Sequence, residues 1–155
     1  MNLFVFWESI KDELTVFLLS AMPVSELRGS IPLGISMGIP TWETYFLSVA
    51  GSLLPAPVLL IFLQPFFGFL RKTVLFRRLI DWSLRRSAKK SHQIKKYGII
   101  GLFLFVAVPL PSTGVWTGCI AASLLGLKFW QAFPAVAAGN MVAGLLVLTI
   151  SHQII

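Results

Sequence analysis

Two ionisable side chains, Glu26 and Arg28, stand two positions apart in a stretch that is otherwise uncharged from residue 14 to residue 42. A charge placed within lipid costs at least about 2.5–3.5 kcal/mol, so such residues are usually paired, hydrated or functional. The spacing allows a mutual ion pair that keeps the carboxylate ionised, or a desolvated carboxyl that takes up a proton. We predict that both residues belong to a substrate- or proton-binding site; the structural alternative is an ion pair that only fixes a turn.

The turn that holds Glu26 and Arg28 is one candidate tip of a helical hairpin. A second candidate tip, residues 109–118 (PLPSTGVWTG), offers hydroxyl groups and one aromatic ring but no charge. Trp116 could hold an organic cation by a cation–π interaction while Glu26 neutralises it. Arg28 and exposed helix amides could instead hold an anionic headgroup, and simple packing is the third interpretation of Trp116. The remaining candidate site residues are the turn residues of both tips and one buried amide: Pro23, Pro32, Pro109, Pro111, Thr113, Gly114 and Asn140.

Little other side-chain chemistry is available. Cys119 is the only cysteine and lies among apolar residues, which favours a packed thiol. His92 and His152 have no second ligand at metal-binding spacing. The sequence also lacks a paired-Asp, Ser–His or HExxH arrangement for intramembrane proteolysis and a nucleotide-binding motif. We therefore predict that the protein is not an enzyme and uses no metal and no cofactor.

The composition indicates where these residues lie. Of 155 residues, 56% are hydrophobic and only 12% are charged, and the mean hydropathy is +0.82. A soluble domain carries about 25% charged residues, so this chain has too few to cover a water-exposed surface. The sequence predicts an all-α integral membrane protein of one domain.

Two uncharged stretches, 44–70 and 129–151, exceed the ~20 residues needed to cross a bilayer and are predicted to be transmembrane helices. Two other stretches, 14–40 and 97–127, are divided by prolines, glycines or charges into shorter apolar arms, which predicts re-entrant hairpins. Residues 1–13 mix aromatic and charged side chains without the features of a signal peptide, and we expect an interfacial helix there.

Residues 71–96 hold ten basic residues and a single acid. Because long uncharged stretches flank this segment, the positive-inside rule places it in the cytoplasm and both termini outside. Nucleic-acid binding is therefore not expected. The segment is a topogenic loop along the membrane surface, or alternatively a site for lipid headgroups or an acidic partner.

A shift of 88 residues aligns the two halves of the chain without a gap. It pairs Gly38 with Gly126, Trp42 with Trp130, and Gly51 with Gly139, among eight identities. Each half contains a hairpin followed by one span, so two halves joined on the cytoplasmic side must have opposite orientations. The sequence thus predicts an inverted repeat, an arrangement that usually places a substrate site near the membrane midplane. The small residues near positions 51 and 139 favour close helix packing, and Asn140 could also hydrogen-bond a hairpin tip.

Three strings resemble the small multi-drug export protein family: PVSELRGSIPLGISMG at 23–38, the basic RRSAKK and KYG at 85–98, and GLFLFVAVPLPSTGVWTG at 101–118. That family is in turn similar to the DedA/VTT membrane proteins, whose first hairpin carries a P-x-x-E pattern that Pro23 and Glu26 match. The resemblance implies two re-entrant hairpins with spans and export of small molecules, or movement of polyprenyl-phosphate lipids. The DedA second hairpin usually carries arginines, whereas residues 107–118 here carry none.

We therefore predict a small transporter in the cell membrane of a bacterium or archaeon, with proton-coupled export of small amphipathic or cationic molecules. The alternatives are a DedA-like lipid translocase or scramblase and a non-transporting structural or assembly protein. The expected partners are membrane lipids, a small-molecule or lipid substrate, and a second copy of the chain, since a homodimer would cover the hairpins.

Overall fold

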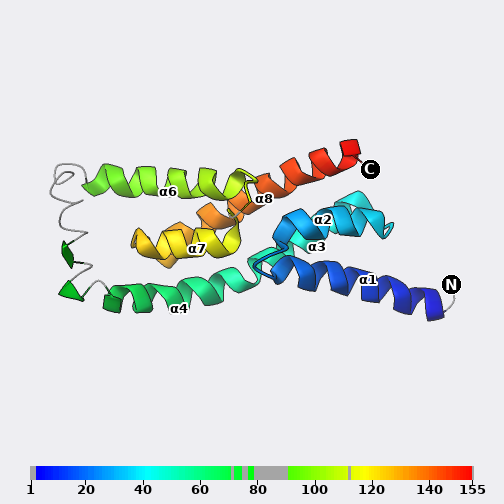
Figure 1. Ribbon diagram of the computed structural model, residues 1–155, viewed down its shortest axis with the longest axis horizontal. Coiled ribbons are helices and arrows are strands. Elements are labelled where there is room, and N and C mark those ends of the chain that lie inside the picture. The colour runs from blue at the N-terminus through cyan, green and yellow to red at the C-terminus, as the bar shows by residue number, and fades with distance from the viewer. Residues whose placement is uncertain (1–2, 71, 75–76, 79–90, 112, 155) are drawn as a thin grey trace.

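The computed structural model describes residues 3–70, 72–74, 77–78, 91–111 and 113–154, and all secondary-structure elements within these residues are helical. Figure 1 shows an elongated bundle in which both ends of the chain lie at one end of the molecule, whereas α4 ends and α6 begins at the opposite end. The helices are α1 (Leu3–Ala21), α2 (Glu26–Ser36), α3 (Thr41–Leu53), α4 (Pro55–Leu70), α6 (Ser91–Ala107), α7 (Val115–Leu124) and α8 (Phe129–Ile154).

Two of these helices are long and apolar enough to cross a membrane. One is Thr41–Leu70, formed by α3 and α4 together, and the other is Phe129–Ile154. Only 33% and 39% of their most apolar windows are buried inside the protein. In water this exposed apolar surface would be unfavourable, whereas in lipid it needs no cover. The two candidate spans confirm the helices predicted over 44–70 and 129–151.

The division between α3 and α4 has a local cause. Pro55 and Pro57 have no backbone N–H, so the preceding turn loses helical hydrogen bonds. The amide of Leu54 still donates to the carbonyl of Ala50 at 3.1 Å, which keeps the two helices in one continuous path.

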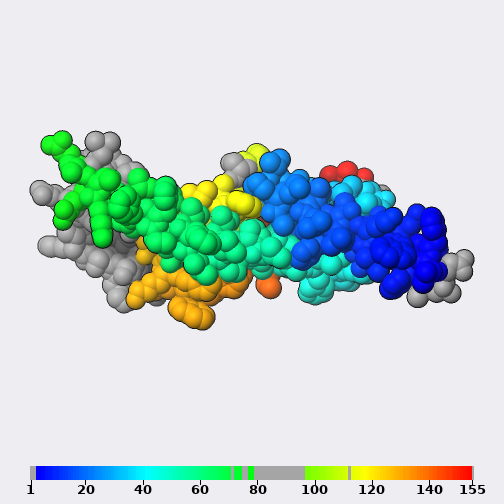
Figure 2. Space-filling view, turned by 90° about the horizontal axis from the view of Figure 1, so that it is seen from below, coloured from blue at the N-terminus to red at the C-terminus, as the bar shows by residue number. Residues whose placement is uncertain are grey.

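The helices pack as two groups that meet at the middle of the molecule. α1, α2 and α3 contact one another, as do α6, α7 and α8. α4 packs on α7 and α8 and so belongs to the second group, and contacts of α2 with α8, α3 with α8 and α3 with α4 join the groups. Figure 2 shows α1 and α4 following one another along a single elongated face.

The helices α2 and α7 end in the same backbone motif. Gly38 after α2 has φ of 84°, and Gly126 after α7 has φ of 69°. The next amides, of Ile39 and Leu127, donate back to the carbonyls of Gly34 and Ala122 at 3.1 and 3.0 Å. Glycine adopts this left-handed conformation without a Cβ clash, which ends each helix and reverses the chain.

Close helix crossings need glycine at two further positions. A Cβ on Gly51 would lie 2.3 Å from the carbonyl oxygen of Phe17, and one on Gly139 would lie 2.7 Å from the carbonyl oxygen of Phe103. α1 therefore crosses α3, and α6 crosses α8, with backbone against backbone. This packing agrees with the close approach expected of the small residues at 51 and 139.

Helix boundaries differ from the predicted segments in two places. α1 runs without interruption through residues 13 and 14, where an interfacial segment was expected to give way to a hairpin arm. α6 begins at Ser91, inside the basic segment 71–96. Charged residues are good helix formers, so a change from polar to apolar composition does not by itself end a helix. Residues 79–90 of the basic segment lie outside the described residues.

Candidate functional site

The two proline-containing turns meet at the centre of the molecule. The first tip (residues 21–28) joins α1 to α2, and the second tip (residues 108–111 and 113–117) joins α6 to α7. In Figure 1 both turns lie midway along the bundle, and three side chains connect them: Glu26, Arg28 and Trp116.

The Glu26 carboxylate lies at the N-terminus of α7. Its Oε1 accepts a hydrogen bond from the backbone N–H of Trp116 at 3.4 Å, and a Cβ on Gly114 would lie 1.7 Å from its Oε2. Helix N-termini carry unpaired N–H groups and partial positive charge, so a carboxylate there is stabilised. Glu26 of one hairpin thus caps the helix of the other, and Gly114 leaves the space it needs.

The backbone of Glu26 is strained. Its φ is +41°, in the left-handed region that residues with a side chain rarely adopt. Conformations of this kind cost of order 1–3 kcal/mol and persist where the surroundings hold them, often at functional sites. The contact with the second tip supplies such a constraint.

Arg28 binds the second tip through Thr113. Its Nη2 donates to the Thr113 carbonyl oxygen and, at 2.8 Å, to the Thr113 hydroxyl. The same hydroxyl lies 2.7 Å from the carbonyl oxygen of Val108 and 3.2 Å from the amide of Leu110, so it also closes the turn after α6. Thr113 is therefore the residue that organises the second tip and presents it to Arg28.

Trp116 connects the tips in the reverse direction. Its indole N–H donates to the carbonyl oxygen of Ala21, the last residue of α1, at 3.2 Å. This bond satisfies a carbonyl that the helix end leaves open. Of the predicted roles for Trp116, the structure thus displays packing and hydrogen bonding, with the ring half-buried between the tips.

The hydrogen bonds of Glu26 and Arg28 go to the opposite hairpin rather than to each other. The mutual ion pair that we considered from their spacing would have tied residues two positions apart. The two charges remain close enough to attract one another. The hydrogen bonds of both charged residues therefore fasten the first tip to the second.

Two small cavities border the tips. A pocket of about 90 Å³ is lined by Pro23, Ser25, Glu26, Arg28, Thr113 and Thr117 among others. A smaller cavity, of about 10 Å³, lies between Glu26, Arg28, Gly114 and Asn140. The second has the size of a single water molecule, and the first can hold a few. Both offer hydroxyl and charged groups to a small polar ligand.

Asn140 approaches this site from α8 and is 2% exposed. It lines the smaller cavity, but its Nδ2 donates to the Ser52 hydroxyl of α3 at 2.7 Å. The side-chain hydrogen bond of Asn140, which from the sequence could have gone to a tip, is made with α3 instead. Ser52, which lies 88 residues before Asn140 and belongs to the small-residue stretch noted near position 51, supports Asn140 without lining either cavity.

Comparison with known proteins identifies the chain. Residues 26–146 match the family model described as "Putative small multi-drug export protein". The chain belongs to this family. No curated protein and no solved structure matches it. The matched region begins at Glu26 and includes the whole second tip. Glu26, Arg28, Thr113 and Trp116, whose contacts form the junction of the two tips, therefore all lie within the matched residues.

Membership of the small multi-drug export protein family indicates a transporter-like, non-enzymatic function, and together with the two apolar helices it indicates a membrane protein. In this family member the other predicted site residues lie apart from the tip cavities. Pro32 lies inside α2, while Pro109 and Pro111 shape the second tip without lining either cavity. No cluster of metal-binding side chains occurs in the described part of the chain.

Removal of the Arg28 guanidinium should separate the tips. We expect Arg28→Gln to lower the free energy of unfolding by about 2 kcal/mol, because hydrogen bonds to charged groups contribute about 1.5–3 kcal/mol. Reversible unfolding in mixed micelles measures the change. The Arg28→Gln/Thr113→Ala double variant should lose less than the sum of the single changes. Strictly additive losses would contradict the contact between Arg28 and the Thr113 hydroxyl.

Proposed function

We propose that the chain is a small multi-pass transporter whose substrate- and proton-binding site is the junction of the two tips. The observation that carries this proposal is the Glu26 carboxylate of one hairpin at the helix N-terminus of the other. A carboxylate in that position couples its own charge to the packing of two separate hairpins. Protonation removes the attraction between Glu26 and the N-terminus of α7 and so weakens the junction.

An inverted repeat gives this junction its symmetry, and three features of the described residues support it. Ser52 and Asn140, which the 88-residue shift makes equivalent, contact each other as residues on a two-fold axis must. Gly38 and Gly126 end their helices identically. The packing of α4 on α7 is matched by that of α8 on α2. In this architecture both tips are re-entrant turns at mid-membrane depth, the basic segment is cytoplasmic and both termini are outside.

The transport cycle that follows has two states. With Glu26 ionised, the tips are joined and the pocket beside them is small. A cationic substrate or a proton neutralises the carboxylate, the tips part, and the pocket opens toward the opposite side. Small amphipathic or cationic molecules are therefore the substrates that we propose, and no enzymatic step or cofactor is needed. The host membrane is that of a bacterium or archaeon, and a second copy of the chain covers the lipid-facing sides of the hairpins.

The test is transport by purified protein in proteoliposomes with an imposed pH gradient. We expect a fluorescent organic cation such as ethidium to move against its gradient only when protons flow the other way, and dissipation of the gradient to stop it. Identical movement with and without the pH gradient would reject proton coupling. Equal fluxes in protein-free liposomes would reject transport.

Arg28 favours one alternative, movement of a lipid phosphate as in DedA-like translocases. A guanidinium beside a helix N-terminus can bind a phosphate, and Pro23 with Glu26 fits the P-x-x-E pattern of that group. The described residues 107–111 and 113–118 contain no arginine to assist it. Rapid flipping of fluorescent phospholipids in the same vesicles would favour this alternative, and a structural protein would give a response in neither assay.

A further inference from the structure

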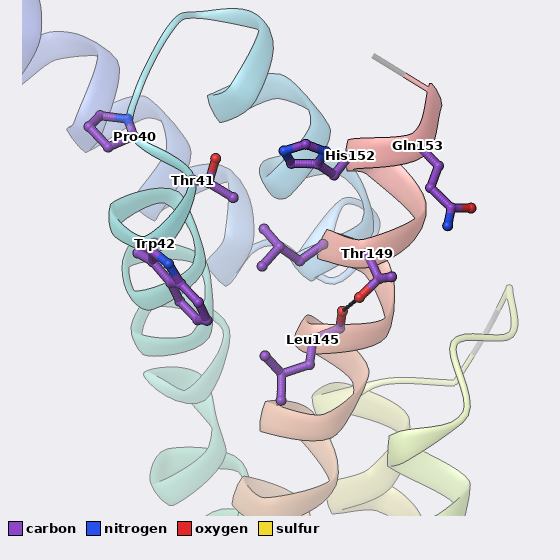
Figure 3. A pocket seen from close by; sticks show the side chains of 8 residues that line it. Pro40, Thr41, Trp42, Leu145, Thr149, His152 and Gln153 are labelled. Atoms are coloured by element: carbon purple, nitrogen blue, oxygen red, sulfur yellow. Dashed lines mark hydrogen bonds between the residues drawn. The ribbon is translucent and has the colours of Figure 1, made fainter.

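A large groove lies at the end of the molecule that carries both termini, remote from the tips. Pro40 and Trp42 form one wall, and Leu145, Leu148, Thr149 and His152 of α8 form much of the other, around a volume of about 680 Å³. Figure 3 shows the two walls facing each other across an open space, with Trp42 on α3 and His152 near the end of α8. We call this space the terminal groove. Its volume lies within the range of sites for small organic ligands.

The terminal groove is amphipathic along α8. Leu145 and Leu148 lie toward the middle of the helix, and His152 lies in its last turn. The Thr149 hydroxyl already donates to the Leu145 carbonyl oxygen at 2.8 Å, so it does not need a ligand. Trp42 is 63% exposed and offers an aromatic face. A ligand that fits has an apolar or aromatic body, with any polar group at the mouth.

Acidic side chains at this end of the molecule favour a ligand whose polar group is positively charged. A neighbouring pocket of about 200 Å³ is lined by Asp12, Glu13 and Glu43, and it shares Pro40 with the terminal groove. Glu43 directly follows Trp42 in the chain. Lys11 supplies the only cation in α1 and the first turn of α3, residues 3–21 and 41–44. An acidic pocket beside the groove attracts a cation and repels an anion, and the aromatic ring of Trp42 adds a cation–π contact.

The opposite end of the bundle carries a different side chain at the equivalent position. There the side chain of Gln64 donates to the Leu127 carbonyl oxygen at 2.8 Å, which ties α4 to the chain after α7. His152 occupies the position 88 residues after Gln64, and it forms part of the groove wall. The two ends of the molecule therefore differ at this pair of positions.

We propose that the terminal groove is a binding site for an amphipathic organic cation, separate from the tip junction. The aromatic and aliphatic body of the ligand lies between Trp42 and Leu145, and its positive charge faces the neighbouring acidic pocket that holds Glu43. This inference rests on the proposed function for its substrate class and adds a second binding site for that class, but binding to the site does not require transport.

The experiment is equilibrium binding to the full-length protein in phosphatidylcholine nanodiscs without a pH gradient. The probes are tetraphenylphosphonium and the similarly shaped anion tetraphenylborate. Leu145→Trp fills the groove, and Leu146→Trp is the matched control, since both leucines are 43% exposed and only Leu145 lines the groove. Glu43→Gln tests the charge, with Glu8→Gln as its control.

We expect saturable binding of tetraphenylphosphonium, weakened at least about tenfold by Leu145→Trp and about fivefold by Glu43→Gln, with both controls unchanged. Equal losses in the two tryptophan variants, equally tight binding of tetraphenylborate, or the lack of saturation would each overturn the proposal. The proteoliposome assay is scored separately. Binding without transport would reject only the transporter, and transport by Leu145→Trp without groove binding would show that the groove is not needed for it.

Discussion

Glu26→Gln is expected to abolish transport driven by a pH gradient while the protein still folds. The glutamine side-chain oxygen can still accept the Trp116 amide hydrogen bond and fits the space beside Gly114. It carries no charge and takes up no proton, so it imitates a carboxyl that is permanently protonated. The initial rate in proteoliposomes should fall at least about tenfold, which corresponds to about 1.4 kcal/mol in the barrier.

The matched control for this variant is Glu8→Gln, which removes an exposed carboxylate from α1. Its gradient-driven rate should equal that of the wild type. Exchange of labelled for unlabelled substrate without a gradient should fall in Glu26→Gln as well, because the same carboxylate neutralises the cationic substrate. A gradient-driven rate that Glu26→Gln leaves unchanged would refute the role of this carboxylate as the proton carrier.

Gly51→Val should prevent α1 from packing on α3. The first added carbon would lie 2.0 Å from the Ser20 hydroxyl oxygen and 2.3 Å from the Phe17 carbonyl oxygen. The Phe17 oxygen is backbone and cannot move alone, so the whole of α1 must shift. Overpacking typically costs about 1–3 kcal/mol, and a backbone collision lies at the upper end of this range, at about 3 kcal/mol. Thermal unfolding in detergent, followed by circular dichroism, measures the loss.

Gly101→Val provides the control, because nothing lies within 4 Å of a Cβ at Gly101. We expect its stability to remain within about 0.5 kcal/mol of the wild type. Gly139→Val should resemble Gly51→Val, since its Cβ would lie 2.7 Å from the Phe103 carbonyl oxygen. If Gly51→Val melted together with the Gly101 control, α1 would not cross α3 at this point.

The helices were predictable because lipid imposes a simple rule. In a bilayer every backbone N–H must find a partner within its own segment, so an uncharged apolar stretch of sufficient length is helical. The two candidate membrane-spanning helices, Thr41–Leu70 and Phe129–Ile154, follow from this rule. The breaks were also readable, since proline removes a donor and glycine permits a positive φ, as at Gly38 and Gly126. The continuation of α1 through residues 13 and 14 could not be predicted from the change in composition there, because charged residues do not by themselves end a helix.

The candidate site was predictable only as a set of residue types. Glu26 and Arg28 were conspicuous because a charge is costly among apolar residues. Their partners Thr113 and Trp116 lie 85 and 90 positions away in the chain. Nothing in the local sequence distinguishes a carboxylate that pairs with its neighbour from one that caps a distant helix.

The sequence by itself determined the membrane character of this chain, its helices, their breaks and the rarity of its charges, because each depends on composition and on local backbone chemistry. Only the tertiary structure decided that Glu26 caps α7, that Arg28 binds Thr113, and that Asn140 pairs with Ser52 instead of a tip. Those contacts depend on how whole helices pack. Packing is governed by the shapes of surfaces assembled from distant parts of the chain, and no short stretch of sequence contains that information.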